Sequence, residues 1–131
     1  MTLNEAATRE VLDVLDTYVR NYNDKNTEKL LSLFSKDISG FGTGDGEVIT
    51  SFSGLRDQLK QDFGPSNALR VTIRVLSTGG VMPAAWITGT FKFEGMLAGK
   101  PVDIDGRVTA VLANRGGRWL FEQLHFSLPG Q

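Results

Sequence analysis

The chain has 131 residues, a formal net charge of −1 and no cysteine. This length suits one domain whose core needs no disulfide or metal, so we interpret residues 1–131 as a single domain. No run of Lys and Arg is present to neutralise phosphates, which argues against nucleic-acid and anionic-membrane partners. One histidine, His125, and no cysteine argue against a thiolate or His-rich metal site, and we expect neither metal nor cofactor.

The N-terminus is polar and unlike a signal peptide. The longest apolar run, residues 81–87, is far too short to cross a bilayer. A cytoplasmic location is therefore the simplest expectation.

Helical periodicity marks the start of the chain. Thr2 and Glu5 match the spacing of a capping box, and an apolar stripe after them predicts a long helix over residues 3–24. The stripe recurs three or four positions apart, at Val11, Val14, Leu15, Tyr18, Val19 and Tyr22.

Two shorter helices are expected next. Asn26 or Thr27 can cap the second helix, which we expect to end at residues 36–37. Ser53 can cap the third helix, and the Gly-Pro pair at residues 64–65 stops it.

A short hairpin is predicted between these two helices. Its strands are residues 38–41 and 48–52, and the Gly-rich segment 42–47 joins them. The glycines favour a turn that needs positive φ. A phosphate-cradling loop is the sharper alternative, but no Lys-Ser/Thr pair follows and no βαβ context surrounds it.

In the second half of the sequence, apolar and polar residues alternate over long segments, which predicts long strands. Short turns at residues 95–100 and 115–117 favour an antiparallel meander. The expected strands are residues 69–77, 82–94, 102–113 and 118–128. Helices first and strands afterwards indicate the α+β class.

Both faces of the strand at residues 102–113 carry apolar side chains. Val108 and Ala110 lie on one side, whereas Val111 lies on the other with Arg107 and Thr109. Because a helical layer covers only one face, we expect the outer face to form a homodimer. The alternative is that helix ends and sheet curvature cover these side chains within a monomer.

Several segments resemble the SnoaL-like branch of the nuclear-transport-factor-2-like (NTF2-like) superfamily over essentially the whole chain. They are the hairpin turn at residues 41–47 and the C-terminal stretches 106–112, 117–119 and 124–129. The resemblance implies a cone-shaped, cystatin-like α+β fold. In it, three helices from the N-terminal half pack on a strongly curved antiparallel sheet that encloses a pocket. The superfamily includes isomerases, dehydratases, cyclases, epoxide hydrolases and assembly domains, so the resemblance implies a fold rather than an activity.

The final strand, residues 119–127, also resembles the association domain of calcium/calmodulin-dependent protein kinase II. This resemblance implies that Arg107 lines the pocket, and it aligns Thr88 with a second arginine of that family. Arg107 is then the one cation at a site where that family has two arginines. We therefore expect an anion site in this chain to bind more weakly or to have a different shape.

Arg107 is the first candidate for ligand binding. Its guanidinium stays charged, so a position in a cavity requires a carboxylate partner. That partner is either a small organic acid or a protein group such as Glu47, Asp105 or Glu122. The alternative is that Arg107 lies at the edge of the sheet and extends its guanidinium group into water.

His125 titrates near neutral pH and could act as a general acid or base. The plainer alternative is a hydrogen-bonded histidine under the helices or at the dimer seam. Trp86 shares its strand phase with Thr88, so it either lines the pocket or packs in the dimer interface.

Tyr18 and Tyr22 lie one turn apart on the apolar face of the first helix, and in a cone fold they face the cavity. Their hydroxyls could donate to a substrate oxygen, although such pairs more often belong to the core.

Two pairs of carboxylates could supply a base or bind a hard cation: Asp45 with Glu47, and Asp103 with Asp105. Neither pair has the spacing of a metal loop, and exposed carboxylates are the plainer interpretation. Glu47 is the best acidic candidate because its turn borders the pocket mouth in the resembled family.

The first functional hypothesis is a domain that binds a small, partly apolar organic acid through Arg107 and aromatic side chains. The second is a cofactor-free isomerase, dehydratase or cyclase whose candidate catalytic residues are His125, Tyr22 and Glu47. The third is a structural dimerisation module.

Overall fold

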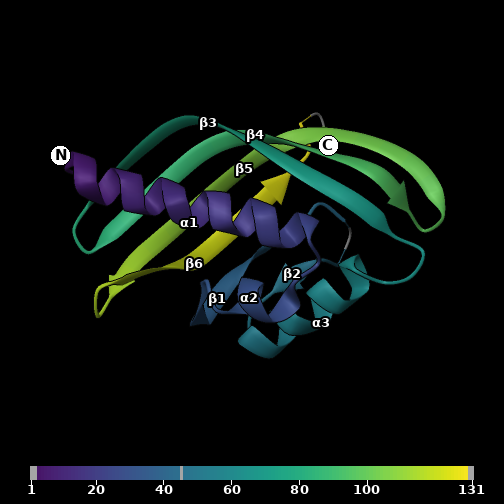
Figure 1. Ribbon diagram of the computed structural model, residues 1–131, viewed down its shortest axis with the longest axis horizontal. Coiled ribbons are helices and arrows are strands. Elements are labelled where there is room, and N and C mark those ends of the chain that lie inside the picture. Colours follow the sequence, from purple (N-terminus) through teal and green to yellow (C-terminus); the bar gives the residue numbers. More distant parts are fainter. Residues whose placement is uncertain (1–2, 45, 130–131) are drawn as a thin grey trace.

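The computed structural model describes residues 3–44 and 46–129 as three helices on one six-stranded sheet (Figure 1). The helices are α1 (Glu5–Asn23), α2 (Thr27–Leu31) and α3 (Phe52–Asp62). The strands are β1 (Phe34–Phe41), β2 (Val48–Ile49), β3 (Ala68–Val81), β4 (Ala84–Leu97), β5 (Lys100–Arg115) and β6 (Arg118–Ser127). The predicted α+β class, with three helices on a curved sheet, is confirmed.

The strands follow the order β2-β1-β6-β5-β4-β3 across the sheet. The predicted meander is present as antiparallel pairs from β3 to β6. β1, in contrast, pairs with β6 in parallel. Figure 1 shows the long strands β3, β4 and β5 arching over the smaller layer formed by β1, β2, α2 and α3.

The second helix is shorter than predicted. α2 ends at Leu31, and β1 already begins at Phe34, inside the range expected to be helical. The backbone amide of Phe121 donates a 2.9 Å hydrogen bond to the carbonyl of Leu33, which ties this segment to the sheet. A short apolar run fits a helix and a buried strand equally well, so its periodicity could not decide between them.

The cap of α1 also differs from the prediction. Asn4 is the N-cap, and its side chain accepts a 2.8 Å hydrogen bond from the amide of Ala7. Thr2, the expected cap, lies outside the described residues. α3 likewise begins earlier than expected, because Ser51 rather than Ser53 caps it and accepts a bond from Gly54.

The core lies between α1 and the inner face of the sheet. Buried residues recur on α1 at helical spacing, and α1 crosses the sheet as Figure 1 shows. On β5 and β6, Leu112 and Phe121 are partners in register and are fully buried. Burying a side chain of this size contributes roughly 1.5–3 kcal/mol to the stability of the fold. Buried and exposed residues alternate along β5 and β6, so these contributions fix which face of the sheet points inward.

The parallel pairing of β1 with β6 requires a close approach at Gly40. Gly40 is the register partner of Leu124, and a Cβ atom at this position would overlap the carbonyl oxygen of Leu124. A glycine is therefore needed where the two strands form one wall of the cavity described below.

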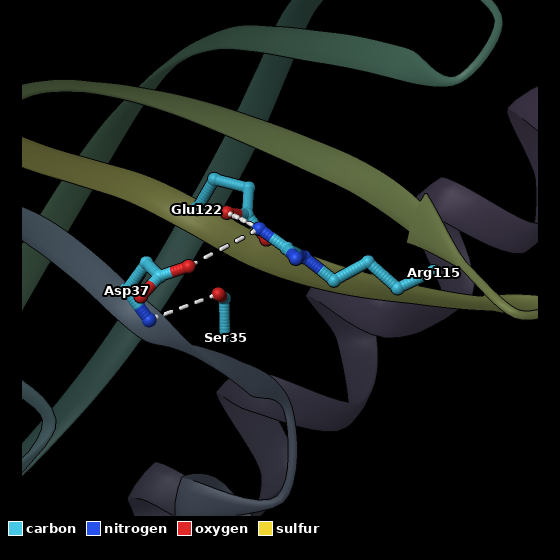
Figure 2. A network of polar contacts seen from close by, with 4 residues as sticks. All are labelled: Ser35, Asp37, Arg115 and Glu122. Carbon is cyan, nitrogen blue, oxygen red and sulfur yellow. Dashed lines mark hydrogen bonds and ion pairs between the residues drawn. The ribbon is translucent and has the colours of Figure 1, made fainter.

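A polar network joins β1, β5 and β6 at the surface (Figure 2). Nε and Nη2 of Arg115 donate to the two carboxylate oxygens of Glu122 at 2.7 and 2.6 Å. Nη2 also lies 3.6 Å from Oδ2 of Asp37, whose amide donates to Ser35 Oγ at 3.0 Å. The hydrogen bonds from Arg115 are the main cause that lowers the pKa of Glu122. Glu122, one of the expected partners of Arg107, is thus held by Arg115.

Within the described part of the chain, no helix combines the length and the apolar character that crossing a bilayer requires.

Candidate functional site

A cavity of about 180 Å³ lies between the inner face of the sheet, α1, α3 and the described part of the β1–β2 loop, of which residues 42–44 and 47 line it. Most of its wall is apolar. Leucine, isoleucine and phenylalanine side chains from every layer contribute, among them Phe34, Leu59, Phe93, Ile104, Leu124 and Phe126. The volume is below the roughly 300–1,000 Å³ of drug-sized sites, so it suits a small molecule.

A chain of hydrogen bonds forms one polar corner of this cavity. The Tyr22 hydroxyl donates to Oδ2 of Asp62 at 2.9 Å, and Nε2 of Gln58 donates to Oδ1 of Asp62 at 2.9 Å. The same Gln58 nitrogen donates to Oε1 of Glu47 at 2.8 Å. Oε2 of Glu47 accepts a hydrogen bond from the amide of Gly44. We call Tyr22, Gln58, Asp62 and Glu47 the polar corner.

Local structure explains how these groups meet. Gln58 and Asp62 lie one turn apart on α3, so both side chains leave the same face of the helix. Tyr22 lies in the last turn of α1, and Glu47 closes the loop between β1 and β2. Three separate segments therefore converge on one carboxylate.

Burial shifts the acid–base properties of the corner. Desolvation raises the pKa of Asp62; the hydrogen bonds from Gln58 and Tyr22 oppose this shift, and the charge of Glu47 adds to it. Burial likewise raises the pKa of Tyr22 and of Tyr18, so both phenols keep their protons at neutral pH. The corner thus presents a phenol donor beside a carboxylate whose protonated form is favoured relative to a carboxylate in water.

Three of the residues predicted from the sequence meet at this cavity. Tyr18, Tyr22 and Glu47 all line it. The Tyr18 hydroxyl has no hydrogen-bond partner among residues 3–44 and 46–129, so it is available to a ligand. Asp45, the other acidic candidate of the loop, lies outside the described residues.

The other four predicted residues lie on the opposite face of the sheet. They are all exposed: Trp86, Thr88, Arg107 and His125. Thr88, Thr109 and His125 are cross-strand neighbours in register, and the ring of His125 lies 5.2 Å from that of Phe41.

The expected position of Arg107 inside the cavity is therefore wrong. Val108 and Ala110 point into the core, and because side chains alternate along a strand, Arg107 must point outward. Thr88 does not line the pocket wall either, because buried Ile87 sets the inward side of β4, and the same alternation places Trp86 on the outer face. On β6, His125 alternates with the buried Leu124 and Phe126 and also points outward. The pocket-lining alternatives for Trp86 and His125 are therefore wrong. The pair Asp103 and Asp105 is also on the outside, where Lys92 binds both at 2.6 and 3.1 Å.

Asp62 and Gln58 were missed by the sequence interpretation. A signal was available, because Gln58 lies three positions after Leu55 and Asp62 three after Leu59, which places both beside the buried stripe of α3.

The family described as SnoaL-like domain matches residues 11–131. Solved structures with the same fold include an NTF2-like protein of unknown function from Pseudomonas putida KT2440. It is 14% identical over 98% of this chain and 91% of that chain, with a TM-score of 0.83. A candidate dehydratase of the NTF2-like family from Streptomyces avermitilis is 13% identical over 98% of this chain and 100% of that chain, with a TM-score of 0.84.

A candidate calcium/calmodulin-dependent protein kinase II association domain from Xanthomonas campestris is 24% identical, with a TM-score of 0.75. The match covers 94% of this chain and 88% of that chain. At these identities the similarity shows the fold alone, and no curated protein matches the sequence. The match over residues 11–131 shows that the chain belongs to the family described as SnoaL-like domain.

Proposed function

We propose that the chain binds a small, mainly apolar molecule in the cavity and holds one polar group of that molecule at the polar corner. The observation that carries this proposal is Asp62, a partly buried carboxylate at the edge of an apolar cavity that the side chains leave open. A domain that served only for assembly would have no need of such a cavity. Ligand sites commonly combine an apolar wall with a few converging polar groups.

The organic acid expected from the sequence does not suit this cavity. That expectation depended on Arg107, which is outside. The described residues that line the cavity include Glu47 and Asp62 but no Lys, Arg or His. A carboxylate ligand would meet two acids without a cation to pair with, which is unfavourable in a partly desolvated site.

A second candidate function is acid–base catalysis of the isomerase, dehydratase or cyclase type. The raised pKa of Asp62 favours it, because such a carboxyl can exchange protons closer to neutral pH than an exposed one. The Tyr18 hydroxyl, which lines the cavity, would donate to a substrate oxygen. Asp62 takes the place of His125, which is on the other face of the sheet. The structure from Streptomyces avermitilis that is described as a candidate dehydratase adds fold-level support only.

The outer face of the sheet is the proposed homodimer interface. Trp86 is 45% exposed there, and its register partner Val111 is half-buried beside it. Exposed apolar groups of this kind are typical of protein contacts. The dimer stays a prediction, as does the cytoplasmic location.

A fragment screen tests the proposed binding function. Small monocyclic fragments are tested for thermal stabilisation of the wild type, of Asp62→Asn and of the matched control Asp57→Asn, an exposed position on the same helix. We expect fragments that stabilise the wild type and the control equally but stabilise Asp62→Asn less. A cavity-filling variant, Ile104→Phe, should lose the stabilisation altogether. The proposal is contradicted if no fragment stabilises the wild type, or if all four proteins respond alike.

A further inference from the structure

We infer that the polar group held at the polar corner is a protonated amine, so that the cavity accepts small aromatic or alkyl amines in preference to alcohols and acids. This inference rests on the proposed binding function and names the ligand class for the same site. Three features of the corner support it: its charge, its surplus of hydrogen-bond acceptors and its aromatic surroundings.

The first feature is charge. Glu47 and Asp62 both accept a hydrogen bond from the same nitrogen atom of Gln58, at 2.8 and 2.9 Å. Two carboxyl groups so close together repel each other when ionised, and a cation between them relieves that repulsion. None of the described residues that line the cavity supplies such a cation. The position is therefore open to a positive charge on a ligand.

The second feature is the balance of donors and acceptors. Tyr22 uses its one proton on Asp62, and Gln58 uses its amide nitrogen on Asp62 and Glu47. Each of the four carboxylate oxygens accepts a described bond, counting the one from Gly44 to Glu47. A carboxylate oxygen can accept about two hydrogen bonds. The carboxylates of the polar corner therefore keep acceptor capacity, whereas the donors of Tyr22 and Gln58 are already in use. An ammonium group has three donors and no acceptor, and it complements such a corner better than a hydroxyl does.

The third feature is the aromatic wall next to the corner. The ring of Tyr22 lies 5.7 Å from that of Phe93 and 5.9 Å from that of Tyr18, measured between centroids. The faces of aromatic rings attract cations, most strongly where water is excluded. The rest of the wall is apolar and its volume is small, which suits a body no larger than one ring.

A direct test compares three ligands that share one body. The whole chain is titrated by calorimetry near neutral pH with 2-phenylethylamine, 2-phenylethanol and phenylacetate. We expect the amine to bind about tenfold or more tightly than the alcohol, because charge-assisted hydrogen bonds are roughly twice as strong as neutral ones, and phenylacetate not to bind.

The outcomes separate this inference from the proposed function. If the alcohol or phenylacetate binds as tightly as the amine, the amine inference is wrong and the binding function stands. If none of the three binds, the inference is also overturned, and the fragment screen above decides independently whether the cavity binds other molecules.

Glu47→Gln provides the matched variant, because it keeps the length of the side chain and one acceptor oxygen while it removes one charge. We expect the affinity for the amine to fall about tenfold, because the ion pair between its ammonium group and the Glu47 carboxylate is lost. The affinity for the alcohol should change less than about twofold, because the alcohol forms no such ion pair. Asp57→Asn should alter neither affinity. If Glu47→Gln does not fold, Asp62→Asn gives the same comparison, and unchanged amine affinity in a folded variant overturns the inference.

Discussion

The Tyr22 hydroxyl donates a 2.9 Å hydrogen bond to Oδ2 of Asp62, and this bond joins the last turn of α1 to the end of α3. Tyr22 is almost fully buried, and its ring packs 5.0 Å from that of Phe63. The bond therefore does two things at once. It satisfies a carboxylate that has left bulk water, and it fixes that carboxylate at the edge of the cavity.

Loss of this hydrogen bond should destabilise the protein. In Tyr22→Phe, the partly buried carboxylate of Asp62 loses a donor, and we expect the free energy of unfolding to fall by about 1–3 kcal/mol. Tyr18→Phe is the matched control, since the Tyr18 hydroxyl has no hydrogen-bond partner in the described ranges. Urea unfolding measures both variants, and equal losses would show that the bond to Asp62 contributes nothing specific.

The raised pKa of Asp62 makes its contribution to stability depend on pH. The folded state binds this proton more tightly than the unfolded state does, for which the ordinary value is 3.8. The favourable contribution is fully present below that value and is lost as pH rises through the folded pKa. We therefore expect Asp62→Asn to gain stability relative to the wild type as the pH rises from acid towards neutral. The free energy of unfolding is measured against pH for the wild type, Asp62→Asn and the control Asp57→Asn. If the difference between Asp62→Asn and the wild type does not change with pH, the prediction is contradicted.

Glu122 should show the opposite pH dependence. Its pKa is lowered, chiefly by the hydrogen bonds from Arg115, so its contribution is present above the ordinary glutamate pKa and lost as pH falls through the folded pKa. Glu122→Gln should lower stability near neutral pH and match the wild type in strong acid (Figure 2). Glu94→Gln, at an exposed position on β4, is the control. A deficit that persisted unchanged into strong acid would assign the effect to packing instead.

The proposed homodimer is tested on the outer face of the sheet. Trp86→Ser removes the largest exposed apolar group of that face, and we expect it to shift the protein from dimer to monomer. Val48→Ser, also exposed but on the edge strand β2, should remain dimeric. Light scattering coupled to size-exclusion chromatography measures both. A monomeric wild type, or a dimer that survives in Trp86→Ser, would refute this interface.

The sequence was sufficient for the architecture because the apolar spacing is regular. Val11 and Leu15 recur at helical spacing on α1, and Val108 and Ala110 alternate along β5. The start of β1 at Phe34 could not be predicted in the same way. Its pairing with β6 connects residues distant in the sequence, and no local pattern encodes a parallel neighbour.

The candidate site was predictable only in part. Tyr18 and Tyr22 were found because the apolar face of a long helix has to point at the sheet. Arg107 was misplaced because the resemblance took precedence over the alternation of its own strand. Asp62 was missed because the environment of a polar residue at a helix end depends on what packs against that end, here Tyr22 from another helix.

The central claim is that the cavity beside Tyr22 and Asp62 is the binding site. Its most direct test is the change in amide chemical shifts of the ¹⁵N-labelled protein during titration with 2-phenylethylamine and with 2-phenylethanol. The account predicts that the largest changes occur at Tyr22, Gly44 and Asp62. Changes confined to the outer face around Thr88, Arg107 and His125 would contradict it.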